Sequence, residues 1–171
     1  FDIYKKLDIL LSNKKVKRKI NFTYIGNLPK NFYFKNSKHI KPLTGKELAK
    51  ELSNHHAYLT ASINEPAGMH HIEGALSGLP LIYRQSGALP EYCNGYGISF
   101  KNDDFLKKIN LMRRNYSKFK QVLHKYPHNA EEMCSKYILL FKQLLKDKEK
   151  IVKSRKIYRN PFHLLINIFF L

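Results

Sequence analysis

The sequence has few cysteines and lacks the signatures of several common functional classes. Its two cysteines, Cys93 and Cys134, show no metal-ligand spacing and provide no disulfide framework, which favours free thiols in a reducing compartment. No helix-turn-helix, zinc-finger, RRM or KH signature is present. The apolar stretch at 161–171 is too short to cross about 30 Å of hydrocarbon as a helix. These absences exclude a disulfide scaffold and a familiar nucleic-acid-binding module.

Acidic residues are also scarce, with 13 Asp and Glu against 31 Lys and Arg and a formal net charge of +18. Of the basic residues 25 are Lys and six are Arg, and Lys is poorer than Arg at bidentate recognition of phosphates or bases. Lys, Asn, Ile, Tyr and Phe share A/T-rich codons, so genomic composition explains part of the charge. We therefore expect no nucleic-acid partner. The strongly basic stretch 146–159, followed by the apolar end at 161–171, instead predicts contact with an anionic membrane surface, or packing of that end onto another domain.

The length of 171 residues suits one domain with a proper core. Apolar spacing predicts alternating strands and helices. Helices are predicted over 1–11, 45–53, from 68 onward, 104–119 and 130–145, and strands over 21–26, 57–62 and 81–83, with an extended piece at 39–41. Thr44 and Glu47 predict a capping box at the second helix. This alternation predicts an α/β fold with a Rossmann-like parallel sheet and flanking helices.

Two glutamates, Glu65 and Glu73, bracket a turn that contains Pro66 and Gly68. The turn follows a predicted strand and leads into a helix, so it lies at the carboxyl end of that strand, where open α/β sheets bind ligands. Backbone N–H groups at the start of a helix attract phosphate, and a carboxylate accepts hydrogen bonds from sugar hydroxyls. The spacing therefore indicates a site for a sugar nucleotide.

The residues from Glu65 to Phe100 resemble, in order and without gaps, the donor-binding domain of GT-B glycosyltransferases of the retaining family-4 type. That pattern is E-P-x-G-x4-E-A-x-A-x-G-x-P, followed by a G-G-x-x-E-like turn and G-x-G. Here Gly78-Leu79-Pro80 follows the second glutamate, and the turn 86–91 precedes Gly95-Tyr96-Gly97. The ordered series of Glu, Gly and Pro is far more specific than a lone E-x7-E pair.

The resemblance assigns roles to six residues of this run. It implies that Glu65 is the catalytic residue, contacting the donor sugar and stabilising positive charge as the glycosyl bond breaks. It also implies donor binding by Glu73 through the ribose hydroxyls, by backbone N–H groups at Gly68 and Met69, by His70 near the phosphates, and by Gly87 in the adjacent loop. No cofactor is implied, and catalysis is expected to be independent of metal. The adjacent histidines at 55–56 and 70–71 point about 100° apart on a helix and cannot easily share one ion.

Three positions depart from the family pattern. Ala67 stands where an aromatic residue is common, Ser86 replaces a glycine, and Gly74 replaces the usual alanine. Glycine within a helix costs about 1 kcal/mol against alanine, so we expect a close approach of backbone or ligand at Gly74. Arg84, after a buried strand, is expected to reach an anionic ligand or to pair with Glu91.

The resemblance also implies what the parent protein does. We expect a hexosyltransferase-type glycosyltransferase, acting with retention from a nucleotide diphosphate sugar onto a glycan or lipid-linked acceptor, peripheral on the cytoplasmic face of a membrane. Residues 1–146 would form a fragment of the C-terminal GT-B domain, without its first central strand and without the acceptor domain, and 147–171 a basic then apolar tail. Two alternatives remain open: a nucleotide-sugar-binding module without catalysis, and a basic membrane or nucleic-acid adaptor.

Overall fold

A computed structural model describes residues 1–102 and 104–155 of the chain. Contacts divide the chain into two units, Phe1–Tyr126 and Pro127–Leu171. The candidate site belongs to the first unit, so that unit is described in more detail. The predicted apolar end at 161–171 lies outside the described residues.

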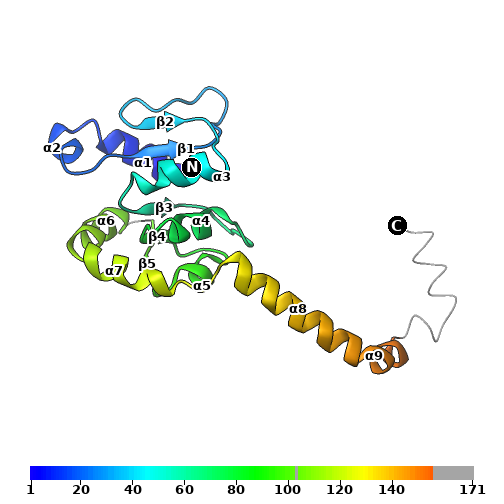
Figure 1. The fold of residues 1–171 in the computed structure, drawn as a ribbon. Coiled ribbons are helices and arrows are strands. Elements are labelled where there is room, and N and C mark those ends of the chain that lie inside the picture. The colour runs from blue at the N-terminus through cyan, green and yellow to red at the C-terminus, as the bar shows by residue number, and fades with distance from the viewer. Residues whose placement is uncertain (103, 156–171) are drawn as a thin grey trace. The chain divides into compact units, whose positions relative to one another are not determined.

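The first unit contains two parallel sheets (Figure 1). In the smaller sheet β1 (Thr23–Ile25) pairs with β2 (Lys38–Ile40). In the larger one β4 (Leu81–Arg84) lies between β3 (Tyr58–Thr60) and β5 (Gly97–Phe100). The predicted α/β class with a parallel arrangement of strands is confirmed.

Helices cover both faces of the three-stranded sheet. Consecutive side chains of β4 point to opposite faces and therefore enter two different cores. Ile82 joins a core with α1 (Asp2–Leu10) and α6 (Phe105–Arg114). Leu81 and Tyr83 join a second core with α4 (His70–Leu76) and α5 (Leu89–Cys93). A central strand that is buried on both sides explains why the stretch 81–84 is continuously apolar apart from its arginine.

Two predicted helix features need correction. The helix predicted over 45–53 is confirmed as α3 (Gly45–Ser53) with Thr44 at the N-cap, but the Thr44 side chain caps no backbone N–H. The helix predicted over 104–119 is broken at Asn115 into α6 and α7 (Tyr116–Val122), after which a 3-10 turn covers Leu123–Lys125. The Asn115 side chain donates to the Leu111 carbonyl, and such local bonds compete with the regular helix.

Some short helices were not predicted, because their segments are too short to show helical spacing. The basic turn after α1 contains α2 (Lys14–Lys17), which Asn13 caps by accepting a hydrogen bond from the Lys15 N–H. The predicted turn at 86–91 leads into α5, which has a proline in its first turn, where the missing N–H costs nothing.

The second unit contains the long helix α8 (Ala130–Lys146) and the short α9 (Lys148–Ser154). Asn129 caps α8 by accepting from the Glu132 N–H. The face predicted for this helix is exposed, and it carries Met133, Tyr137, Leu140, Phe141 and Leu144. Within residues 1–102 and 104–155, no helix is both long enough and apolar enough to cross a membrane.

Candidate functional site

The turn after β3 holds the Glu65 carboxylate close to the start of α4. Glu65 Oε2 lies 3.5 Å from His70 Nε2, and both side chains are partly exposed. A Cβ on Gly68 would lie 2.7 Å from Glu65 Oε1 and 3.1 Å from the His70 ring. Glycine at this position is therefore what allows the turn to fold over its own carboxylate.

A second loop, which follows β4, is bonded to this turn. The Ala88 N–H donates to the Glu65 carbonyl at 2.8 Å, and the Asn64 N–H donates to the Ser86 hydroxyl oxygen at 2.9 Å. Gly87 has φ +58°, and a Cβ there would overlap the backbone of Glu65. The loops after two neighbouring parallel strands thus meet at the carboxyl edge of the sheet.

Tyr58, on β3, connects the turn to the body of α4. Its hydroxyl lies 3.4 Å from His70 Nδ1, and its ring stacks on the His70 ring with 6.1 Å between centroids. A Cβ on Gly74 would lie 2.5 Å from the Tyr58 ring. Burial is the main cause that raises the pKa of Tyr58, and the nearby Glu73 carboxylate raises it further, so the Tyr58 hydroxyl stays protonated.

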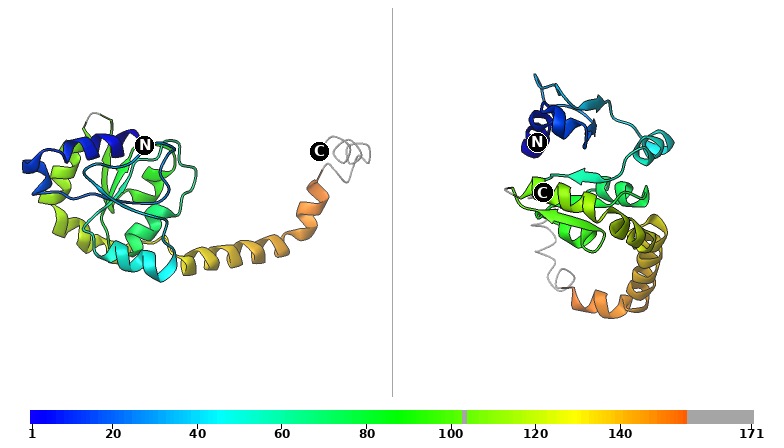
Figure 2. Two further views of the ribbon diagram at one scale, coloured as in Figure 1. Left: turned by 90° about the horizontal axis from the view of Figure 1, so that it is seen from above. Right: turned by 90° about the vertical axis from the view of Figure 1, so that its left-hand side faces the viewer.

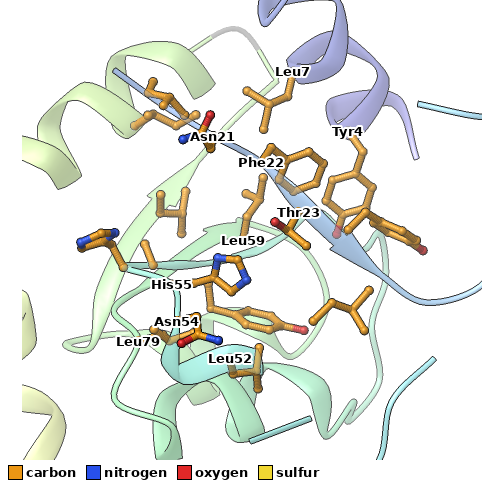
Figure 3. Close-up of a pocket in the computed structure, with 18 of the residues that line it drawn as sticks. Tyr4, Leu7, Asn21, Phe22, Thr23, Leu52, Asn54, His55, Leu59 and Leu79 are labelled. Carbon is orange, nitrogen blue, oxygen red and sulfur yellow. The ribbon is translucent and has the colours of Figure 1, made fainter. Parts of the chain in front are cut away.

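A large cavity of about 940 Å³, called the central cavity below, opens beside α4. His70 and Glu73 of α4 line it, together with Phe22 just before β1, Thr23 of β1 and Leu59 of β3. Figure 3 shows Phe22, Thr23 and Leu59 around this space. Glu73 lies in the first turn of α4, one helical turn after the Glu65 loop ends.

The site residues predicted from sequence fall into two groups. Glu65, Gly68, His70 and Gly87 form one contact network at the carboxyl edge of the sheet. Glu73 faces the central cavity beside His70. Met69 lies between Gly68 and His70 in sequence and is 58% exposed. A backbone role for Met69 is compatible with this exposure.

Arg84 does not pair with Glu91. Its Nη2 lies 2.7 Å from both carboxylate oxygens of Asp2, at the start of α1. The arginine is buried, and its hydrogen bond to Asp2 lowers the pKa of that carboxyl group. Arg84 therefore has a structural partner from 82 residues away, which no local pattern could reveal.

The adjacent histidines at 55–56 and at 70–71 have different surroundings. His55 lies 3.6 Å from Glu51 on α3, and the His56 ring contacts Tyr116. The His71 side chain is buried, whereas that of His70 is partly exposed. In the part of the chain that the structure describes, no three His, Cys, Asp or Glu side chains are grouped so that they could hold a metal ion.

Sequence reasoning missed Tyr58 as a member of this site, although one signal pointed to it. Gly74 predicted a close approach inside the helix, and the structure confirms it, with the Tyr58 ring as the approaching group. A tyrosine in a short buried strand gives no sign by itself of which helix its ring will cover. Asn64, which has φ +52° just before Glu65, was also missed.

Replacing Gly74 with alanine is expected to destabilise the first unit by about 1 kcal/mol. Alanine would favour the helix by about 1 kcal/mol, but its Cβ would overlap the Tyr58 ring, and overpacking of this kind costs about 1–3 kcal/mol. Urea unfolding of Gly74→Ala measures the change. In a Tyr58→Ala background the cost should fall by more than half, because the ring is gone and only the residual contact with Cβ of residue 58 remains. An equal cost in both backgrounds would show that the ring is not what requires glycine.

No protein-family model matches this chain, and no curated protein matches it.

Proposed function

We propose that this chain is the donor-binding part of a GT-B glycosyltransferase and holds a nucleotide diphosphate sugar at the carboxyl edge of its sheet. The observation that carries the proposal is the meeting of the Glu65 turn, the start of α4 and the Ser86–Gly87 loop, next to a cavity of about 940 Å³. The order of these residues in the sequence resembles the family pattern. Their contacts bring that ordered run together in one place.

Each carboxylate has a distinct role in the proposed mechanism. Glu73 accepts hydrogen bonds from the ribose hydroxyls, because it faces the cavity and a carboxylate is an acceptor only. Glu65 lies beside the donor sugar, and its negative charge stabilises the positive charge that develops as the glycosyl bond breaks. Backbone N–H groups at Gly68 and Met69 contact the sugar and the phosphates.

His70 links the Glu65 carboxylate to Tyr58. It lies within ion-pair distance of Glu65 and close to the Tyr58 hydroxyl, so its ring orientation is fixed from both sides. His70 also lines the central cavity, so in the proposed site its ring lies beside the phosphates, and a phosphate oxygen would replace Glu65 or Tyr58 as the partner of one ring nitrogen. The diphosphate is thus held by N–H donors and His70, and retention of configuration and independence of metal follow from the family resemblance.

The parent protein would act at a membrane surface. In the proposed arrangement this chain contributes the C-terminal, donor-binding half of a GT-B fold, and the other half of that fold would bind a glycan or lipid-linked acceptor. The net charge of +18 supports contact with anionic lipid on the cytoplasmic face, and so does the exposed apolar face of α8.

Calorimetric titration of the chain with UDP, GDP, ADP and their common sugar conjugates tests the proposal. We expect selective binding of one base, and a loss of affinity of about 30-fold or more in Glu73→Gln, because a carboxylate that accepts hydrogen bonds contributes about 2 kcal/mol. Glu47→Gln is the matched control, since it removes the same charge from an exposed position in the first turn of another helix, α3. Its affinity should equal that of the parent chain.

Two results would contradict the proposal. Absence of binding by a chain that circular dichroism shows to be folded would reject a nucleotide site in this chain. Binding of all anions alike, weakened by salt and unchanged in Glu73→Gln, would instead identify a basic adaptor. Selective binding that never leads to sugar release, when the acceptor-binding half is supplied, would keep the site and identify a binding module without catalysis.

A further inference from the structure

Two segments of the first unit contain basic residues but no acidic ones. Residues 9–46 carry ten Lys and Arg side chains, and residues 105–130 carry seven. Ten of these cations lie on three helices or directly beside them, and all ten residues are exposed. They form what is called the basic surface below: Lys14, Lys15, Lys17, Arg18 and Lys19 on or just after α2, Lys107, Arg113 and Arg114 on α6, and Lys118 and Lys120 on α7.

The charges of the basic surface are not offset by nearby acids. Within residues 1–102 and 104–155, none of its ten side chains lies within 4.0 Å of a carboxylate oxygen. Other cations of the first unit do have such partners: Lys38 lies 3.1 Å from Glu51, and Lys108 lies 3.5 Å from Asp104. Exposed positive charges without local acids create a positive potential that attracts an anionic partner.

The three helices of the basic surface lie at one end of the first unit. Val16 and Ile20, on and after α2, pack against the same core as Ile109 and Met112 of α6 and Phe119 of α7. Figure 1 shows α2, α6 and α7 at the same end of this unit, and the view from above in Figure 2 agrees. Cations that are far apart in the sequence therefore belong to one surface.

This end corresponds to the amino edge of the sheets. The His56 ring, just before β3, contacts the Tyr116 ring at the start of α7. Near the end of α1, the Asp8 carboxylate accepts N–H groups from residues 35–37, just before β2, and α2 begins four residues after α1 ends. The Glu65 turn, in contrast, follows the carboxyl end of β3. The basic surface and the candidate site thus lie at opposite edges.

We propose that the basic surface docks the first unit on an anionic lipid bilayer. Near such a leaflet each Lys or Arg strengthens binding by about fivefold, and a cluster of this size is typical of surfaces that bind anionic headgroups. Two leucines of α6, Leu106 and Leu111, lie among the cations and are each 43% exposed. Leu111 is four residues after Lys107 and three before Arg114, so the three share one side of the helix. Aliphatic side chains between cations suit the interface between headgroups and hydrocarbon.

The basic surface is less suited to nucleic acid. Seven of its ten cations are Lys, whose ammonium group lacks the planar fork with which Arg recognises phosphates and bases. Proteins that bind single strands stack bases on exposed aromatic rings. The aromatic residues of α6 and α7 do not offer such rings, since Phe105 is buried and Tyr116 and Phe119 are partly buried. A bilayer, which needs only charge and shallow apolar contact, fits the basic surface better.

Docking through the basic surface sets the orientation of the candidate site. The Glu65 turn would face away from the bilayer, because it lies at the opposite edge of the sheet. This docking surface rests on the membrane contact of the proposed function, but it does not require the donor site. Lipid binding can therefore be measured without any nucleotide.

Cosedimentation of the full chain with vesicles of equal parts phosphatidylglycerol and phosphatidylcholine tests the proposal. Three variants, each with three substitutions to Gln, remove equal charge from exposed residues: K14Q, K15Q and K17Q on α2; K107Q, R114Q and K118Q on α6 and α7; and, as the matched control, K41Q, K46Q and K50Q on or near α3. The α2 variant and the variant of α6 and α7 should each bind about 100-fold more weakly than the parent chain. The control should bind within about threefold of the parent chain, because its lysines lie outside the basic surface.

Three outcomes would overturn the proposal. Equal binding by the α2 variant and the control would show that only the total charge of the chain matters. A loss in the α2 variant but not in the variant of α6 and α7 would show that these helices do not form one surface. Tighter binding to a single-stranded oligonucleotide than to vesicles, weakened in both variants, would make nucleic acid the partner. Nucleotide titration of the same samples keeps the two proposals separate, because lipid binding without nucleotide binding would reject the donor site and leave the docking surface in place.

Discussion

Substitution of Gly87 by alanine is expected to reduce both the stability of the first unit and the affinity of the candidate site. Gly87 has φ +58°, a conformation that costs an L-residue about 1–2 kcal/mol. A Cβ at this position would also overlap the Glu65 backbone, whose carbonyl accepts the Ala88 N–H. Relief of the overlap requires the two loops to separate, which breaks that hydrogen bond. The total expected cost is about 3 kcal/mol in urea unfolding.

Gly95→Ala is the matched control for this substitution. Gly95 has φ +86°, but a Cβ there meets no atom within 4 Å. It should therefore cost about 1 kcal/mol through backbone strain alone and leave nucleotide affinity unchanged. If Gly87→Ala and Gly95→Ala had the same effect on stability and on binding, the contact between the Gly87 loop and the Glu65 turn would contribute nothing, and the site would not depend on it.

Asp8→Asn is expected to destabilise the first unit by about 3 kcal/mol at pH 7. The buried Asp8 carboxylate accepts the Ser37 hydroxyl at 2.6 Å and the N–H groups of Lys35, Asn36 and Ser37 at 2.8–3.0 Å. An asparagine directs its NH2 group at some of these donors, and each lost bond to a charged group costs about 1.5–3 kcal/mol, partly offset by relaxation of the loop. Urea unfolding measures the change. Glu132→Gln, on an exposed part of α8, is the control and should be nearly neutral.

The effect of Asp8 should depend on pH in a defined direction. Burial alone raises the pKa of Asp8, but the hydrogen bonds from Ser37, Lys35 and Asn36 outweigh burial and hold that pKa below 3.8. A carboxyl group whose pKa is lower in the folded state stabilises the fold above its unfolded pKa, and this contribution is lost as pH falls through the folded pKa. The difference between the parent chain and Asp8→Asn should therefore be constant from pH 7 to about 4 and should narrow below that. A difference that stayed constant to pH 2 would show that the charge of Asp8 is not involved.

Local sequence patterns identified most elements of the first unit. The stretch 81–83 was predicted as a strand from its consecutive apolar residues, and 45–53 was predicted as a helix from the residue types of a capping box at 44 and 47. The break at Asn115 was not predictable, since apolar spacing continues across it. It coincides with a single hydrogen bond from the Asn115 side chain to the Leu111 carbonyl. The predicted capping box does not form: the residue types are present at 44 and 47, but the Thr44 side chain caps no backbone N–H.

The candidate site was partly predictable because several of its residues are close together in sequence. Glu65, Gly68, His70 and Glu73 lie within nine residues, so the turn and the helix that follow β3 bring them together by local geometry alone. The contact of Gly87 with the Glu65 backbone depends on two strands pairing in parallel and in one register. The partner of Arg84 could not be predicted from sequence, because Asp2 lies on a distant helix, α1. Asp2 reaches the arginine only because α1 packs on the sheet.

The sequence by itself determined the α/β class, the approximate positions of strands and helices, and the order of glutamate and glycine residues on which the proposed function rests. Those features follow from periodicity and turn chemistry, which act over a few residues. The tertiary structure alone decided that Tyr58 requires glycine at position 74, that Asp2 neutralises Arg84, and that β1 and β3 face each other across a cavity. These depend on contacts between residues far apart in the chain, whose partners are chosen by how helices and strands pack and not by any pattern within a segment.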